Sequence, residues 1–284
     1  MSSALQSTST HRGGFPLDRE SPVVVERKVK ALLRQLTVER FDSISDQIVA
    51  WANKSEKEKD GLTLFIVSKL VFKKAIDEEP HSELYVRLCR KMIEKISPKV
   101  QDDGYKDSEG KPSAGGNLFR KYLLNICQEA FERGWSAKEA TAATKATADK
   151  AVEEVNEKTK AGEDSGLHSD EYYAAAKAKR RRLSLIHLFG ELFKLQILTE
   201  RAMHECIQKF LRNVENPEEE EIESVCKLLT TVGSLLDTPK ARAHIDVYFS
   251  RMRELTKNKN VNAHMVSILQ VCTPVPIPCA NDIH

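Results

Sequence analysis

The sequence predicts an all-α protein, an α-solenoid of about five HEAT-like antiparallel helix pairs that form a crescent. Two observations predict this class. Apolar residues recur at helical spacing through most of the 284 residues. The chain also has only 12 Gly, 10 Pro and 6% aromatic residues, too few for the many turns of a sheet protein. Helix pairs of roughly 40 residues that cannot bury their apolar faces alone are typical of stacked repeats.

The domain boundaries follow from where helical spacing starts and stops. Residues 1–21 are rich in Ser, Thr and Gly without apolar periodicity, which predicts a disordered lead-in. Residues 22–270 form the predicted HEAT-repeat domain, interrupted by a Gly-rich loop at 98–117 and a charged excursion at 136–171. Three prolines stop the helical pattern after Gln270, so residues 271–284 are expected to be an irregular tail.

The first helices are predicted where apolar side chains share one helical face. They are expected at residues 26–36, 41–53, 60–78, 82–96 and 118–134. Later helix starts are marked by a capping residue followed by proline, at Asn216 and at Thr238. The acids Glu218 to Glu221 suit the first turn of such a helix and predict a solvated helix start rather than a metal site.

A run of bases leads into the most apolar segment of the chain. Residues 185–198 carry apolar side chains around most of a helix, which predicts a helix in the middle of the protein. The basic run before it has no acid between Tyr172 and Arg182, although like charges on a helix repel. A solvated face, a calmodulin-type target and a nucleic-acid surface are all compatible with this run. We favour phosphate contact through the run, which comprises Lys177, Lys179, Arg180, Arg181 and Arg182.

The sequence offers no recognisable enzyme site, so no catalytic residue, cofactor or metal is predicted. It lacks the common phosphate-cradling, nucleophile-elbow and zinc motifs. His204, Glu205 and Cys206 are adjacent and therefore diverge on a helix, and His187 has no partner at ligand spacing. The six cysteines form no C-x-x-C pair and are expected to be reduced. Without a signal peptide or a long apolar run, we expect a cytoplasmic protein with no membrane partner.

Several long blocks resemble the middle domain of eukaryotic translation initiation factor 4 gamma, with the fungal form as the nearest likeness. The likeness is carried by SDEYYAAAKAKRRRLSLIHLFGELFKLQILTERAMHECIQKFL, VVERKVKALLRQLTVERFDSISDQI, LVFKKAIDEEPHSELYVRLCRKM, NLFRKYLLNICQEAFERGW and VCKLLTTVGSLLD. These blocks span about residues 24 to 270. No short motif carries the likeness, so the blocks are specific as a set.

The resemblance implies a monomeric scaffold that binds and activates the DEAD-box RNA helicase of initiation, contacts messenger RNA and binds other initiation factors. Such a scaffold holds the two helicase lobes and favours their closed arrangement. Carried over, the helicase surface would include Leu32, Leu33, Arg34 and Phe41, although core packing explains the leucines equally well. The RNA-contacting face would join Arg120 and Lys121 to the basic run.

The last repeat departs from the family pattern. His264 and Val266 stand where the resemblance implies cations, and Ser267 stands where it implies a large apolar residue, so the second helicase contact is in doubt. The codon of Val271 begins with GT, as most introns do, and a Cys272 codon follows it, which leads to the hypothesis that the tail is translated from an unspliced intron. The alternative function is a HEAT adaptor of nuclear RNA processing or decay, which would bind RNA and protein without stimulating a helicase.

Overall fold

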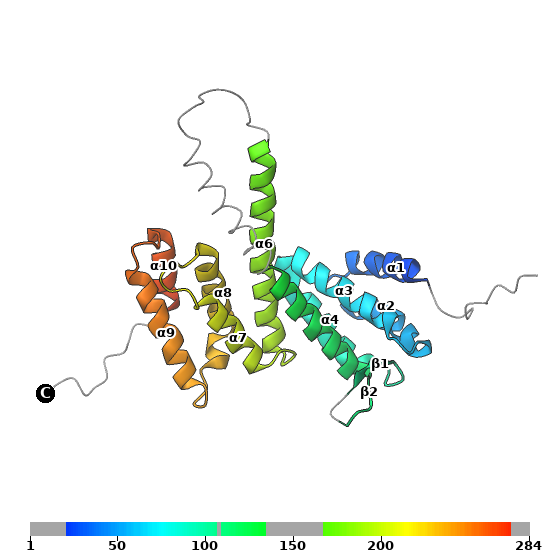
Figure 1. Cartoon of the computed structure of the whole chain (residues 1–284). Helices are drawn as coiled ribbons and strands as arrows, with labels where there is room; N and C mark the ends of the chain where they lie inside the picture. The colour runs from blue at the N-terminus through cyan, green and yellow to red at the C-terminus, as the bar shows by residue number, and fades with distance from the viewer. Residues whose placement is uncertain (1–20, 107–108, 135–166, 274–284) are drawn as a thin grey trace, which may run out of the picture.

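The computed structural model describes residues 21–106, 109–134 and 167–273. Within these residues the chain forms ten α-helices that follow one another as five pairs in an open arch (Figure 1). The predicted solenoid of about five helix pairs is confirmed. Two pairs build one side of the arch: α1 (Pro22–Arg34) with α2 (Phe41–Asn53), and α3 (Leu62–Asp77) with α4 (Ser82–Lys95).

The central pair consists of the helix at residues 115–134 and the long helix α6 (Leu167–Lys194). Beyond α6, the other side of the arch is built by two further pairs (Figure 1). These are α7 (Glu200–Phe210) with α8 (Glu219–Leu236), and α9 (Arg242–Lys257) with α10 (Ala263–Cys272). Two short 3-10 turns, η1 (Lys54–Lys57) and η2 (Glu79–His81), precede α3 and α4.

One continuous hydrophobic core runs through the arch, because each helix turns its apolar stripe toward its neighbours. In α1, Val25, Val29 and Leu33 repeat every four residues, and all three are buried. The C-terminal half of α6 is apolar on most sides, and α6 packs against α3, α4, α7 and α8. The predicted central position of residues 185–198 is thereby confirmed.

The predicted loop at 98–117 is wrong in part. Residues of β1 (Gln101–Lys106) and β2 (Pro112–Ala114) pair antiparallel, and the next helix already begins at residue 115. The glycines that indicated a loop permit a close helix contact: a Cβ on Gly116 would lie 1.9 Å from the carbonyl oxygen of Ile93. Tyr122 anchors the hairpin by donating its hydroxyl proton to Asp102.

The element boundaries also differ from the prediction. The helix starts at Asn216 and Thr238 are wrong by a few residues, because α8 begins at Glu219 and α9 at Arg242. Thr238 Oγ1 still accepts a hydrogen bond from the amide of Ala241 at 3.2 Å, but it closes a turn before the helix. The last helix continues past Gln270 to Cys272.

The outer predictions fall largely on residues that lie outside the described ranges. These are the lead-in up to residue 20, residues 136–166 of the charged excursion and the tail from residue 274. The end of the excursion, residues 167–171, belongs to α6. Among the described helices, none is both long and apolar enough to cross a membrane.

Candidate nucleic-acid interface

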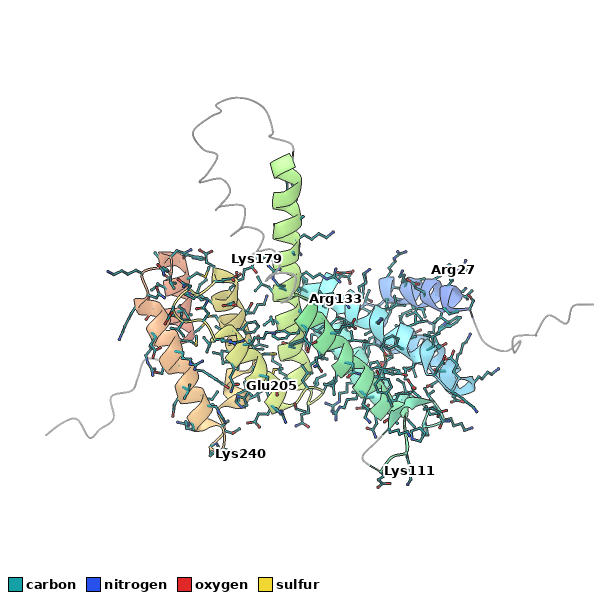
Figure 2. All side chains as sticks on the ribbon, in the orientation of Figure 1. Arg27, Lys111, Arg133, Lys179, Glu205 and Lys240 are labelled. Atoms are coloured by element: carbon teal, nitrogen blue, oxygen red, sulfur yellow. The ribbon has the colours of Figure 1, made fainter. Side chains whose placement is uncertain are left out.

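The basic run lies midway along α6, where this helix meets the neighbouring helices of the arch (Figure 2, where Lys179 is labelled). Successive residues on a helix diverge by about 100°, so the five cations point in several directions rather than forming one stripe. Lys177 and Arg180 are exposed, and neither makes an ion pair with another described residue. These two side chains are therefore available to an external anion.

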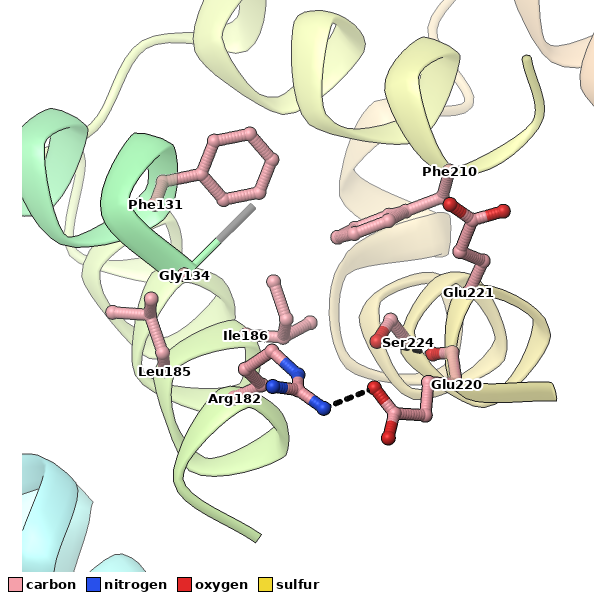
Figure 3. Close-up of a pocket in the computed structure, with 9 residues that line it drawn as sticks. All are labelled: Phe131, Gly134, Arg182, Leu185, Ile186, Phe210, Glu220, Glu221 and Ser224. Carbon is pink, nitrogen blue, oxygen red and sulfur yellow. Dashed lines mark hydrogen bonds and ion pairs between the residues drawn. The ribbon is translucent and has the colours of Figure 1, made fainter. Parts of the chain in front are cut away.

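The other three cations meet acids of this chain. Lys179 Nζ lies 2.8 Å from Glu223 of α8, and the Arg182 guanidinium pairs with Glu220 on the first turns of the same helix (Figure 3). Arg181 Nη1 lies 3.9 Å from Asp77 of α3. The hydrogen bond to Glu223 raises the pKa of the Lys179 amine. The absence of acids within the run therefore does not leave all five cations unpaired, because their acidic partners come from distant segments of the sequence.

A second set of contacts joins both sides of the arch at the same level of α6. Glu79 of η2 accepts a hydrogen bond from Ser184 Oγ at 3.0 Å and pairs with Lys227 of α8. Burial alone would raise the pKa of the Glu79 carboxyl, but the bonds from Lys227 and Ser184 outweigh burial and lower it. Glu79 is therefore held in its charged form between three helical segments.

The predicted RNA-binding residues Arg120 and Lys121 have structural partners at the opposite end of the central pair. Arg120 donates from Nη2 to the carbonyl oxygen of Gln196, just after α6 ends. Lys121 Nζ donates to the carbonyl oxygen of Lys106 at 2.8 Å and to Ser113 Oγ at 2.6 Å. Gly134, which lies beside Arg182, follows Arg120 by 14 residues on the 115–134 helix, and this corresponds to about 20 Å along the helix axis. The structure thus separates the two halves of the predicted RNA face.

Sequence reasoning missed three cations that the fold brings beside the run. Lys69 and Lys73 of α3 and Arg133 of the 115–134 helix line one open groove together with Arg181 and Arg182. We call this feature the basic groove. The available signal was the pair Lys69 and Lys73, four residues apart in a largely apolar helix and therefore on one face. Only the tertiary structure places that face beside α6.

A second hollow lies beneath the Arg182–Glu220 pair, between Phe131, Ile186 and Phe210 (Figure 3). Its volume is about 30 Å³, the share of a single water molecule in the liquid. It is too small for a ligand, so we treat it as a packing defect between the central pair and α8.

The predicted helicase-binding residues divide by burial. Leu33 and Phe41 are 2% and 6% exposed, and the guanidinium carbon of Arg87 lies 4.5 Å from the Phe41 ring centroid. Leu32 is partly buried, whereas Arg34 is exposed. Between them, the turn from α1 to α2 presents Val38, which is 67% exposed. Core packing accounts for Leu33 and Phe41. Of the predicted residues a partner can reach Arg34 and the edge of Leu32, and the exposed turn adds Val38.

Among the described residues, no group of three or more metal-binding side chains converges. His204, which was singled out in the sequence, packs inside: its Nδ1 lies 3.1 Å from the hydroxyl oxygen of Tyr248. Burial raises the pKa of the Cys89 thiol to about 12, so this cysteine is a packed apolar residue rather than a nucleophile.

Comparison with known proteins decides the family. Residues 26–278 match the model of the MIF4G domain. The chain belongs to the MIF4G family. This MIF4G domain is of the type found in fungal translation initiation factor 4 gamma, since it is 48% identical over 249 residues to eukaryotic translation initiation factor 4 gamma of Schizosaccharomyces pombe. That match covers 87% of this chain but only 16% of the relative.

Two further comparisons agree with this assignment. The eukaryotic initiation factor 4F subunit p130 of Saccharomyces cerevisiae is 41% identical over 222 residues, which cover 76% of this chain and 22% of that protein. The MIF4G domain of Trypanosoma cruzi translation initiation factor EIF4G5 has the same fold, with a TM-score of 0.51 at 16% identity. That alignment covers 88% of this chain and 94% of the solved one. The chain therefore spans about a fifth or less of the curated relatives named here.

Proposed function

We propose that this MIF4G domain is a cytoplasmic, monomeric and non-enzymatic scaffold of translation initiation. It binds the DEAD-box RNA helicase of initiation, raises the helicase's activity and contacts messenger RNA. The observation that carries the proposal is the 48% identity over 249 residues to the Schizosaccharomyces pombe factor. The relatives named above are initiation factors, which favours this function over a nuclear adaptor of RNA processing.

The arch supports a helicase-binding role because its two ends lie well apart on either side of α6 (Figure 1). A rigid frame that contacts both lobes of a two-lobed enzyme stabilises one relative arrangement and shifts the population toward it. At the N-terminal end, we assign the contact to Arg34 and Val38, which are exposed above the buried Leu33 and Phe41. Leu33 and Phe41 contribute by holding the turn in place.

The RNA contact is assigned to the exposed cations of α6, with Lys177 and Arg180 first. Lys179 and Arg182 join them only when an RNA phosphate displaces Glu223 or Glu220 from their present pairs. Phosphate contacts of this kind depend on salt and tolerate any base sequence. Arg120 and Lys121 are left out, because their amines and guanidinium groups already bind backbone carbonyl oxygens.

The test is the RNA-stimulated ATPase rate of the purified helicase with and without this chain. We expect a higher rate with the chain and none from the chain alone. Val38→Asp should weaken helicase binding about tenfold, equivalent to 1.4 kcal/mol, without changing the melting temperature. Leu235→Asp is the matched control, because Leu235 is also exposed, at 51%, but lies on α8 and not in either end pair of the arch.

Two results would contradict the proposal. One is an unchanged helicase rate at a chain concentration that saturates binding, which would favour the adaptor function. The other is equal loss of binding in the Val38 and Leu235 variants, which would show that the effect of the Val38 variant is not specific to the α1–α2 turn.

A further inference from the structure

The basic groove is built from three helix faces of equal length. The lining residues of α3 are Lys69, Phe72, Lys73 and Ile76, a set spaced i, i+3, i+4, i+7. The 115–134 helix and α6 contribute sets with the same spacing: Ile126, Glu129, Ala130 and Arg133, and Ala178, Arg181, Arg182 and Leu185. Each set spans about two helical turns, or about 10 Å. The groove encloses about 580 Å³, within the range of ligand-binding clefts.

The floor of the groove is aliphatic and shallow. Ile76, Ile126 and Leu185 belong to the core and are each less than 10% exposed, at 4%, 6% and 7%. Ala130 and Ala178 line the groove above them, and because their side chains are short they leave the space between the three helices open. Phe72 offers no stacking platform, since its ring is only 7% exposed.

The rim is strongly cationic. Lys69, Lys73, Arg133, Arg181 and Arg182 face a single acid among the described lining residues, Glu129, which gives the lining a formal charge of +4 (five cations less one acid). Glu129 pairs with Arg133 on its own helix. Outside the lining, Glu220 pairs with Arg182, and Asp77 lies 3.9 Å from Arg181. Lys69 and Lys73 are exposed and make no ion pair with another described residue, so these two lysines carry the unpaired charge of the rim.

We propose that the basic groove is a docking site for a short, acidic, amphipathic helix of a partner protein. A helix of two to three turns would place aliphatic side chains at i, i+3 or i+4, and i+7 on the floor, and carboxylates beside the rim cations. The length of the three lining sets matches a helix of two to three turns, and the positive charge of the rim favours an acidic helix. Single-stranded RNA fits less well, because bases gain affinity by stacking on aromatic faces and the floor presents none.

This proposal stands apart from the proposed function. The groove is formed by α3, the 115–134 helix and the groove-facing side of α6, whereas the helicase contact is assigned to the turn after α1. Lys177 and Arg180, the first RNA contacts, do not line it, and Arg182 is the one proposed RNA contact that also belongs to the groove. A failure of the groove proposal would therefore leave the helicase and RNA proposals untouched, and the reverse also holds.

The probe is a synthetic peptide of about 14 residues with Leu at i, i+3, i+4 and i+7 and Glu at most other positions. A scrambled peptide of the same composition is its control. Binding to the full chain is followed by fluorescence anisotropy, and the site by amide chemical shifts. We expect the amphipathic peptide to bind about tenfold more tightly than the scrambled one and to shift the amides of the three lining sets.

Variants then test the site. The rim variant Lys69→Glu with Lys73→Glu should weaken the amphipathic peptide about tenfold or more. The variant Arg253→Glu with Lys257→Glu makes the same charge change on exposed positions of α9 and should leave binding unchanged. Ala130→Glu adds a charge to the floor and should abolish the difference between the two peptides, with the melting temperature reporting whether the fold is kept.

Three outcomes would overturn the proposal. Equal binding of both peptides would show charge attraction without a docked helix. Equal losses in the rim and α9 variants would show that the groove is not the site. Shifts of the lining amides by oligouridylate but not by the peptide would make the groove part of the RNA surface.

Discussion

Two cationic regions of the central helix pair, alike in sequence, have different roles in the structure. Arg120 and Lys121 bind backbone carbonyl oxygens of the β-hairpin and of the segment after α6. In the basic run, by contrast, Lys179 and Arg182 are neutralised by carboxylates of α8, and Lys177 and Arg180 stay exposed. The role of a cation in this domain therefore depends on the acceptor that the fold brings to it. A carbonyl oxygen fixes the backbone, whereas a surface carboxylate can be exchanged for a phosphate.

The largest expected effect separates the two regions by stability. Lys121→Met removes the ammonium group and leaves Ser113 Oγ and the carbonyl oxygen of Lys106 without their donor, so we expect a loss of about 1–3 kcal/mol in the free energy of unfolding. Lys177→Met, the matched change in the basic run, should alter it by less than about 0.5 kcal/mol. Urea unfolding measures both. Equal losses would mean that the two regions do not differ.

The next effect separates them by RNA affinity. Removing Lys177 and Arg180 together as methionines should flatten the slope of log K against log salt for oligouridylate by about 1.4, since each phosphate contact on single strands contributes about 0.7. Lys240→Met with Lys259→Met is the control, because both lysines are exposed on the α9–α10 side of the arch. An unchanged slope in the first variant would remove the exposed half of the basic run from the RNA site.

A smaller effect sharpens the role of the carboxylates on α8. Glu220→Gln with Glu223→Gln releases Arg182 and Lys179 from their pairs, so more cations become available to phosphate. We expect RNA to bind a few-fold more tightly and the salt slope to steepen by up to about 1.4. Stability should fall slightly, because both pairs are partly exposed. Weaker RNA binding in this variant would show that the carboxylates support the site instead of competing for it.

The smallest effect is a pH dependence at Glu79. Its folded-state pKa lies below the ordinary value of 4.5, so the carboxyl contributes stability above the unfolded pKa and loses it as pH falls through the folded pKa. Other acids also titrate in this range, so the informative quantity is the difference in melting temperature between the wild-type chain and Glu79→Gln. We expect this difference in melting temperature to shrink as pH falls below about 4.5. A constant difference from neutral to acid pH would show that Glu79 does not titrate in this way.

Much of the fold could be predicted because helices are encoded locally. The spacing of Val25, Val29 and Leu33 is visible without any partner, and the apolar circumference of residues 185–198 indicated a central helix. Boundaries failed where tertiary contacts decided them. Gly115 and Gly116 indicate a loop by composition, yet a helix begins at residue 115, because the absence of a side chain on Gly116 lets this helix pack against the backbone of Ile93. The capping residue predicted at Thr238 was correct in chemistry but closes a turn before the helix, whereas the amide of Asn216 itself donates to the side chain of Asn213.

The sequence by itself determined the solenoid, its family and the existence of a cationic segment on α6, because each depends on residues close together in the chain. Only the tertiary structure decided which cations are free. Glu220 lies 38 residues from Arg182 along the chain, and Lys69, Lys73 and Arg133 belong to other helices than the basic run. Electrostatic pairing depends on distance in space, and sequence separation carries no information about that distance beyond a few helical turns.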